Sequence, residues 1–71
     1  MALSTKQYDM LEAAIAKGTR ISVWRRGSEY IVIPERMRLK DGREVIDARH
    51  PSTGHHLELW IDEMDGFEVV K

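Results

Sequence analysis

The apolar pattern of the chain changes its period at Gly18, and this change limits the possible folds more than any other feature. Before Gly18, apolar residues recur at helical spacing, as Tyr8, Leu11 and Ile15 do. After it, short apolar segments alternate with polar residues and are separated by turn residues, a pattern typical of β-strands. The sequence therefore predicts a mainly β protein with one N-terminal helix.

The helix is expected over about residues 5–17. Ser4 and Gln7 have the spacing of a capping box, in which each side chain satisfies a free backbone N–H group of the other. Met10 widens the apolar stripe of the helix. Gly18 is suited to end the helix as a left-handed cap.

Five short strands are expected between about residues 20 and 70. Gly27 indicates a turn, and Asp41-Gly42 is a strong signal for a two-residue hairpin. Pro34 has no N–H group for a strand ladder, so it indicates an edge, a bend or a bulge in a long strand. The apolar segments of these strands are residues 21–24, 30–39, 44–48, 56–61 and 67–70.

The helix and strands are expected to form a single domain over residues 1–71. A flat five-stranded sheet would leave two long edges exposed, whereas a curled sheet hides most of them. We therefore expect a small Sm-like or SH3-like five-stranded barrel. Tyr8, Leu11 and Ile15 would place the helix at one end of the barrel or over an open side.

Several classes of protein are excluded by composition. The 71 residues contain no cysteine, so a disulfide scaffold is ruled out, and a reducing cytoplasmic location is expected. No apolar run approaches the roughly 18 residues of a membrane helix, so we expect no membrane contact. We also expect no enzyme and no cofactor, because nucleophile elbows and glycine-rich phosphate loops are missing from the sequence.

The net charge of −1 conceals an uneven distribution along the chain. Residues 17–49 hold nine basic and five acidic residues, a balance of +4. Residues 50–71 hold five acidic residues and one lysine, a balance of −4. Either these charges form ordinary solvated strand faces, or they make a surface of two signs that recognises a charged partner or a second copy.

Three histidines lie close together in the sequence, at His50, His55 and His56. Neighbouring residues of a strand point to opposite faces, so at most one of His55 and His56 can join His50. Two histidines without a placed carboxylate make a weak ligand set, so we expect a solvated loop and no metal site.

The two tryptophans alternate against the apolar register of their strands, which places both on the face away from the main core. Trp24 and Trp60 are therefore either covered by the helix or Pro34, or exposed as aromatic contacts. Arg25 and Arg26 follow Trp24 directly, and arginine beside an aromatic ring suits a protein contact or a base-stacking platform.

Two segments resemble the Rof-type proteins, and the likeness extends over about residues 8–68. The helix pattern Tyr8-Asp9-x-Leu11-Glu12-x-Ala14 resembles the opening of that family, and residues 57–67 resemble its closing strand and turn. The family is bacterial and Sm-like, and its best-known member inhibits the transcription termination factor Rho by occupying its RNA-binding domain. The resemblance implies a binding module of transcription regulation that contacts Rho or a similar RNA-binding machine. Its partner-binding residues would be Asp9, Glu12, Trp24, Arg25, Arg26 and Trp60.

A second resemblance leads to an alternative function. Residues 32–34 and 39–43 are similar to the pattern of WYL-type domains, bacterial regulatory barrels that sense ligands. This alternative is a module that binds single-stranded nucleic acid or a small ligand, and RNA is then the expected partner. The residues involved would be Arg25, Arg26, Arg38, Arg43 and Trp24. A third possibility is self-association through strand edges.

Overall fold

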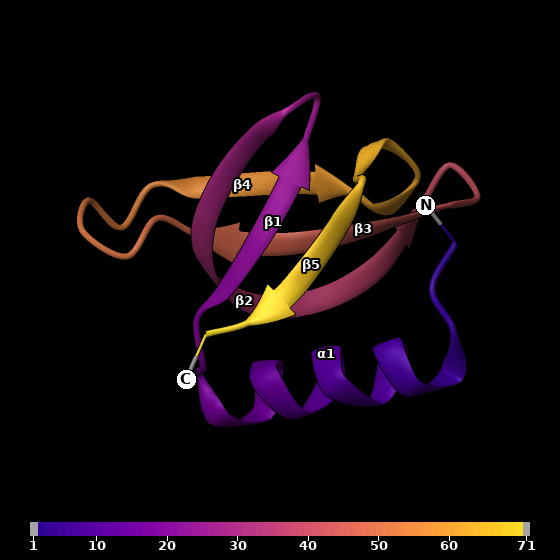
Figure 1. The fold of residues 1–71 in the computed structure, drawn as a ribbon, viewed down its shortest axis with the longest axis horizontal. Coiled ribbons are helices and arrows are strands. Elements are labelled where there is room, and N and C mark those ends of the chain that lie inside the picture. Colours follow the sequence, from indigo (N-terminus) through magenta and orange to yellow (C-terminus); the bar gives the residue numbers. More distant parts are fainter. Residues whose placement is uncertain (1, 71) are drawn as a thin grey trace.

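The computed structural model describes residues 2–70 and contains one helix followed by a five-stranded antiparallel sheet (Figure 1). The mainly β class and the helix over residues 5–17 are confirmed. No helix within these residues is long and apolar enough to cross a membrane. The elements are α1 (Thr5–Lys17), β1 (Ile21–Arg25), β2 (Ser28–Lys40), β3 (Arg43–Arg49), β4 (His56–Trp60), a short 3₁₀ turn η1 (Ile61–Glu63) and β5 (Gly66–Val69).

Both ends of α1 are capped as the sequence predicts. The Gln7 backbone N–H donates to the Ser4 hydroxyl at 3.2 Å, and the Ser4 N–H donates to the Gln7 side chain at 2.8 Å. Gly18 ends the helix with a φ of 67°. Leu11 is fully buried, but the expectation that Met10 widens the buried stripe is wrong, because Met10 is 39% exposed.

Two tight turns determine how the strands pair. Arg26 and Gly27 join β1 to β2, while Asp41 and Gly42 join β2 to β3, and all four residues have positive φ. Consecutive positive φ values are the mark of a two-residue turn that matches the twist of a hairpin. The resulting strand order is β4-β3-β2-β1-β5.

A bulge in β2 changes which residues face the core. Pairing with β3 shifts between Pro34 and Arg36, so Glu35 is the extra residue of β2. Before the bulge the even-numbered residue Val32 is buried, and after it the odd-numbered Met37 packs against the core. The bend or bulge predicted at Pro34 is thus a bulge, and it divides the sheet into two halves.

The two halves enclose one hydrophobic core. The half formed by β5, β1 and the first part of β2 faces the half formed by the rest of β2, β3 and β4, and α1 lies beside β2 and β5 (Figure 1). Leu11 of the helix belongs to the same buried cluster as Val23 and Ile46. The other buried members are Ala14, Ile21, Val32, Ala48, Leu59, Ile61, Met64 and Phe67.

The expected closed barrel is not observed, because the sheet is bent but open. Within residues 2–70, β4 and β5 are the two ends of the strand order and do not pair with each other. The chain leaves β4 through η1, and the Asp65 N–H then donates to the Trp24 carbonyl at 2.7 Å. This bond draws the chain to β1, so β5 extends the sheet on the side away from β4.

Candidate functional site

The outer surface of the second half of the sheet is covered by charged side chains. We call this surface the paired-charge face. The strand register places Arg36 opposite Asp47, and Asp47 opposite Glu58. Alternation along the strands places the other members on the same face. The face consists of Arg36, Arg38, Lys40, Arg43, Val45, Asp47, Arg49, His56, Glu58 and Trp60.

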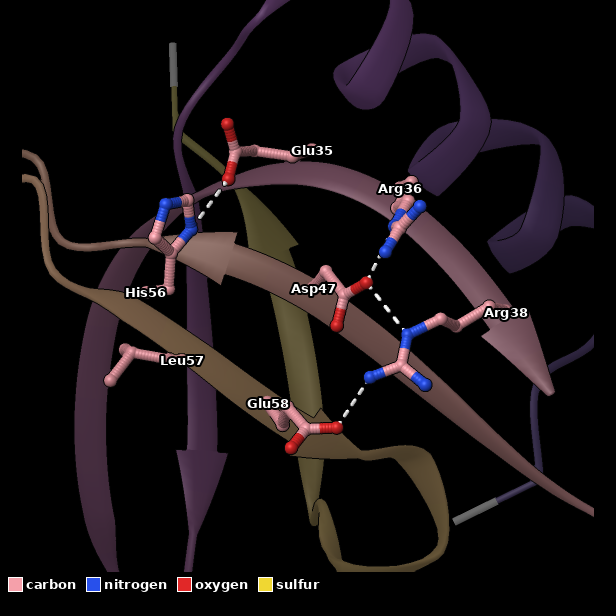
Figure 2. A pocket seen from close by; sticks show the side chains of 7 residues that line it. All are labelled: Glu35, Arg36, Arg38, Asp47, His56, Leu57 and Glu58. Carbon is pink, nitrogen blue, oxygen red and sulfur yellow. Dashed lines mark hydrogen bonds and ion pairs between the residues drawn. The ribbon is translucent and has the colours of Figure 1, made fainter. Parts of the chain in front are cut away.

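Asp47 lies at the centre of this face and accepts two charged hydrogen bonds (Figure 2). Arg38 Nε donates to Asp47 Oδ2 at 2.7 Å, and Arg36 Nε donates to the same oxygen at 2.6 Å. These bonds, that from Arg38 first, lower the pKa of Asp47 to about 2. The carboxylate is therefore ionised at neutral pH and is not a general acid.

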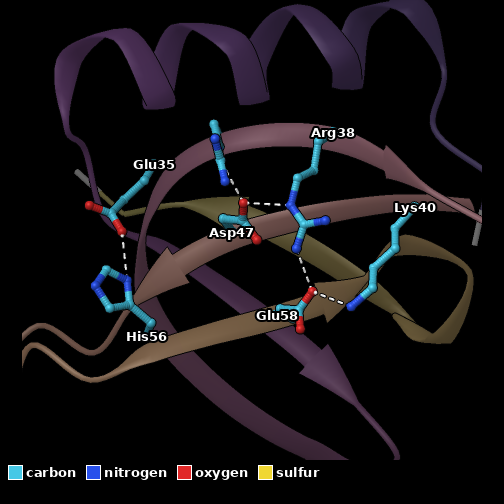
Figure 3. Close-up of polar contacts among 7 residues, drawn as sticks. Glu35, Arg38, Lys40, Asp47, His56 and Glu58 are labelled. Atoms are coloured by element: carbon cyan, nitrogen blue, oxygen red, sulfur yellow. Dashed lines mark hydrogen bonds and ion pairs between the residues drawn. The ribbon is translucent and has the colours of Figure 1, made fainter.

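Glu58 extends the network toward the β2–β3 hairpin (Figure 3). Arg38 Nη2 donates to Glu58 Oε2 at 2.5 Å, and Lys40 Nζ lies 3.4 Å from the same oxygen. The hydrogen bond to Asp47, with a further one to Glu58, raises the pKa of Arg38. Because Arg38 donates to two carboxylates, much of its positive charge is already neutralised within the molecule.

Glu35, the extra residue of the β2 bulge, lies against side chains of both β3 and β4, and Figure 2 shows its contact with His56 of β4. Its carboxylate lies 3.2 Å from His56 Nδ1 of β4 and 3.7 Å from Arg49 Nε of β3. All three side chains are well exposed, so each contact contributes little to stability.

A concavity of about 590 Å³ lies over these groups (Figure 2). It is lined by Glu35, Arg36, Arg38, Asp47, His56, Leu57 and Glu58. Its three carboxylates, Glu35, Asp47 and Glu58, already lie against arginine side chains, so a ligand here would have to displace existing ion pairs. The arrangement offers charge of both signs but no activated nucleophile.

Trp60 is covered by cations of the β2–β3 hairpin. The Arg43 guanidinium lies 4.1 Å from the centre of the Trp60 ring, and Lys40 Nζ lies 5.9 Å from it. Arg43 also donates to both oxygens of Asp62, at 2.8 and 2.7 Å, and lies 3.3 Å from Glu63. The hydrogen bonds to Asp62 raise the pKa of Arg43 and lower that of Asp62.

Trp24, Arg25 and Arg26 lie together at the end of β1, apart from the paired-charge face. Trp24 is half-buried on the outer surface of the first half of the sheet. The Arg25 guanidinium lies 5.4 Å from the centre of the Tyr30 ring. Arg26 is exposed in the turn, where its backbone N–H donates to Asp65 at 3.1 Å.

Asp9 and Glu12 are both exposed on α1. Within residues 2–70 neither side chain has an ion pair or hydrogen bond. The helix that carries them is held by buried Leu11 and by a hydrogen bond from the Tyr8 hydroxyl to Glu44, which raises the pKa of Tyr8. Two unpaired carboxylates are thus presented on a firmly packed helix.

The three histidines do not form a cluster. The His50 ring contacts the Ser52 hydroxyl at 3.0 Å, and the His50 backbone N–H donates to the His55 carbonyl. His56 contacts Glu35 instead. Among the residues that the structure describes, no three metal-ligating side chains come together.

The residues that sequence reasoning missed are the acids of the paired-charge face. Counting outward from the Asp41-Gly42 turn places Arg36 opposite Asp47, so this pair was open to prediction. The position of Glu58 could not be predicted in this way. Residues 50–55 form a longer loop, which does not determine the β3–β4 register.

No protein-family model matches the sequence, and a comparison with curated proteins finds no relative. The resemblances to Rof-type and WYL-type proteins therefore stay predictions.

Proposed function

We propose that the chain is a non-enzymatic bacterial binding module of transcription regulation that recognises a basic surface of a protein partner. The proposal rests on a difference in pairing between the acidic and the basic side chains of the chain. Asp9 and Glu12 are exposed and unpaired within residues 2–70, whereas Arg38 and Arg43 are each bound by neighbouring carboxylates.

The exposed acidic pair Asp9 and Glu12 on α1 is suited to a partner protein that itself binds nucleic acid. Asp9 and Glu12 are three residues apart, so they lie on neighbouring positions of one helix face. A surface that binds RNA phosphates is rich in Lys and Arg, and two carboxylates held on a rigid helix complement such a surface. The partner implied by the Rof resemblance, the cytoplasmic termination factor Rho, has this chemistry.

The arrangement of the sheet supports assigning the fold to the Sm-like or SH3-like small barrels. The strand order, the strong bend of β2 and the helix packed beside β2 and β5 are compatible with a partly open barrel of this type. Function is argued from the site and not from this fold, because small barrels serve many unrelated purposes.

The proposal is tested by measuring the binding of the chain to purified Rho and its effect on termination in vitro. The double variant Asp9→Asn/Glu12→Gln removes both charges and keeps the size of the side chains. We expect it to bind about tenfold more weakly at low salt, since exposed charges contribute up to about 1 kcal/mol each. The difference should shrink as salt rises.

Lys6 and Lys17 supply the matched control, because both are exposed on the same helix with the opposite charge. Replacing both by Gln should leave Rho binding unchanged or slightly stronger. The absence of any association between the chain and Rho, or an equal loss in both double variants, contradicts the proposal.

A nucleic-acid site remains a second candidate only at the end of β1. Arg25 and Arg26 have no carboxylate partner among the described side chains, and Trp24 lies beside them. Titration with a short single-stranded RNA at two salt concentrations tests it. Binding that weakens with salt and is lost in Arg25→Ala/Arg26→Ala supports this site, and a flat titration removes it.

A further inference from the structure

The outer surface of the first half of the sheet carries several apolar side chains, and within residues 2–70 the helix packs on the other side of the sheet, against the core. We call this outer surface the β1 face. The pairing of β1 with β2 and β5 places three residues from each strand side by side on it. Its members are Arg20, Ser22 and Trp24 of the β1 region, Glu29, Ile31 and Ile33 of β2, and Gly66, Glu68 and Val70 of the β5 region.

The part of this face next to the β1–β2 turn combines an apolar surface with open space. Ile31 is 46% exposed, and Trp24 is half-buried. Gly66 lies beside Trp24 and has no side chain, and apart from its two neighbours in the chain no described residue lies within 4 Å of where its Cβ would be. An apolar side chain can therefore contact Trp24 and Ile31 without displacing any group of the protein.

Two carboxylates flank this apolar surface. Glu68 lies opposite Ser22 on β5, and Glu29 lies opposite Trp24 on β2, so β1 runs between them. Both acids are exposed, and neither side chain has an ion pair or hydrogen bond within residues 2–70. Among the described members of the face, the basic one is Arg20, at the other end beside Ile33. On this face the charged side chains nearest to Trp24 are therefore Glu29 and Glu68, while Arg25 and Arg26 lie at the adjoining end of β1 and in the turn.

The size of the face favours a short segment over a second copy of the chain. Three strands about 4.8 Å apart and four residue steps of about 3.3 Å span about 10 by 13 Å, or roughly 300 Å² with side chains. A stable dimer buries about 800 Å² on each partner, more than twice this area. The face can accommodate one apolar side chain with its neighbours on either side.

We propose that the β1 face binds a short extended segment of a protein partner in which one apolar side chain is flanked by basic residues. The apolar side chain packs against Trp24 and Ile31 above Gly66. Its basic neighbours pair with Glu29 and Glu68. This inference rests on the proposed function only in taking a protein as the partner, and it uses a surface separate from the acidic helix.

The probe is the peptide acetyl-Lys-Ala-Leu-Ala-Lys-amide, titrated into the full chain labelled for NMR. We expect binding at about millimolar concentration, as is usual for a peptide this short. The indole N–H signal of Trp24 should move together with the backbone amides of Ser22 and Ile31. The indole signal of Trp60, which Arg43 covers, should stay in place.

Matched variants separate the apolar contact from the charges. Ile31→Thr keeps a β-branched residue and should weaken peptide binding at least about threefold. Leu39→Thr changes an apolar side chain that is 70% exposed on the other half of the sheet, and it should leave binding unchanged. Glu29→Gln/Glu68→Gln should weaken binding about threefold at low salt and less at high salt.

Several outcomes would overturn the proposal. The first is that the Trp24 signal does not move up to about 10 mM peptide. The second is that the matching Glu-Ala-Leu-Ala-Glu peptide binds as well as the lysine peptide. The third is that Leu39→Thr weakens binding as much as Ile31→Thr does. Movement of Trp24 with an oligouridine but not with the peptide would overturn it in favour of RNA. Asp9→Asn/Glu12→Gln should bind the peptide normally, so a failure of Rho binding and a failure at the β1 face give different results.

Discussion

The two halves of the bent sheet share β2 and a common core, yet their outer surfaces differ in how their carboxylates are paired and in how much apolar surface they expose. On the paired-charge face, Asp47 and Glu58 each accept contacts from two cationic side chains. On the β1 face, Glu29 and Glu68 have no such partners within residues 2–70, and Ile31 is 46% exposed. Strand β2 thus runs from a surface with exposed apolar side chains to a surface whose charged side chains are paired with one another.

This difference teaches that the number of charges on a surface is a poor guide to where a partner binds. The paired-charge face has more charged residues, but a ligand there must first displace bonds such as that from Arg38 to Asp47. Displacing such bonds offsets much of what a new contact contributes. The β1 face and the Asp9–Glu12 side of α1 have fewer charges, and their carboxylates have no partner within residues 2–70.

The largest expected effect comes from the core, which the two halves share. Leu11→Ala removes a fully buried side chain of α1 and should lower the free energy of unfolding by about 3 kcal/mol. Urea unfolding followed by circular dichroism measures this. If both halves depend on one core, they should unfold in a single transition. Two separate transitions would show that the halves are independent, and a loss below about 1 kcal/mol would contradict the place of Leu11 in the core.

The next largest effect should distinguish the outer faces. Asp47→Asn removes the charge that Arg36 and Arg38 share, and we expect a loss of about 1–2 kcal/mol in the free energy of unfolding. Glu68→Gln removes an acid that has no partner within residues 2–70, and it should change stability by less than about 0.5 kcal/mol. Equal effects of the two substitutions would contradict the distinction between the faces.

Acid should weaken the paired-charge face in a defined range of pH. Because the folded pKa of Asp47 is about 2, below its ordinary value of 3.8, its contribution to stability is complete above pH 3.8 and is lost as pH falls toward 2. The stability difference between the unaltered chain and Asp47→Asn should therefore narrow over this range. Urea unfolding at several pH values measures it, and a constant difference would rule out the ion pairs as its cause.

The smallest expected effect concerns the cation that covers Trp60. Arg43→Lys keeps the charge but loses the two-pronged contact with Asp62 and the planar stack on the ring. We expect only a small loss of stability, since these groups are exposed. The Trp60 indole N–H signal in NMR should shift while that of Trp24 does not. Movement of both signals would mean that the two tryptophans are coupled.

Much of the fold could be predicted from local signals in the sequence. The capping box at Ser4, the glycine at Gly18 and the Asp41-Gly42 turn each act over a few residues, and each is found where it was expected. Barrel closure could not be predicted in this way. It depends on whether β4 and β5 meet, which is decided by η1 and by the bond from Asp65 to Trp24.

The candidate sites were less accessible to prediction than the fold. Alternation correctly placed Trp24 and Trp60 away from the core, but it could not show that they lie on the outer surfaces of different halves. The alternative nucleic-acid function requires Arg38 and Arg43 to be available to a ligand. Their carboxylate partners include Glu58 and Asp62, about 20 residues away in sequence, and only the packed sheet brings these together.

The bulge at Glu35 makes the length of β2 as important as its composition. Val32 and Met37 are five positions apart, so both can face inward only because the bulge takes Glu35 out of the alternation. If Glu35 took an ordinary place in the ladder, alternation would direct Arg36 and Arg38 toward the core. Point substitutions along the exposed side of β2 should thus be tolerated in evolution far better than the insertion of one more residue, which would need a second bulge to keep the same faces.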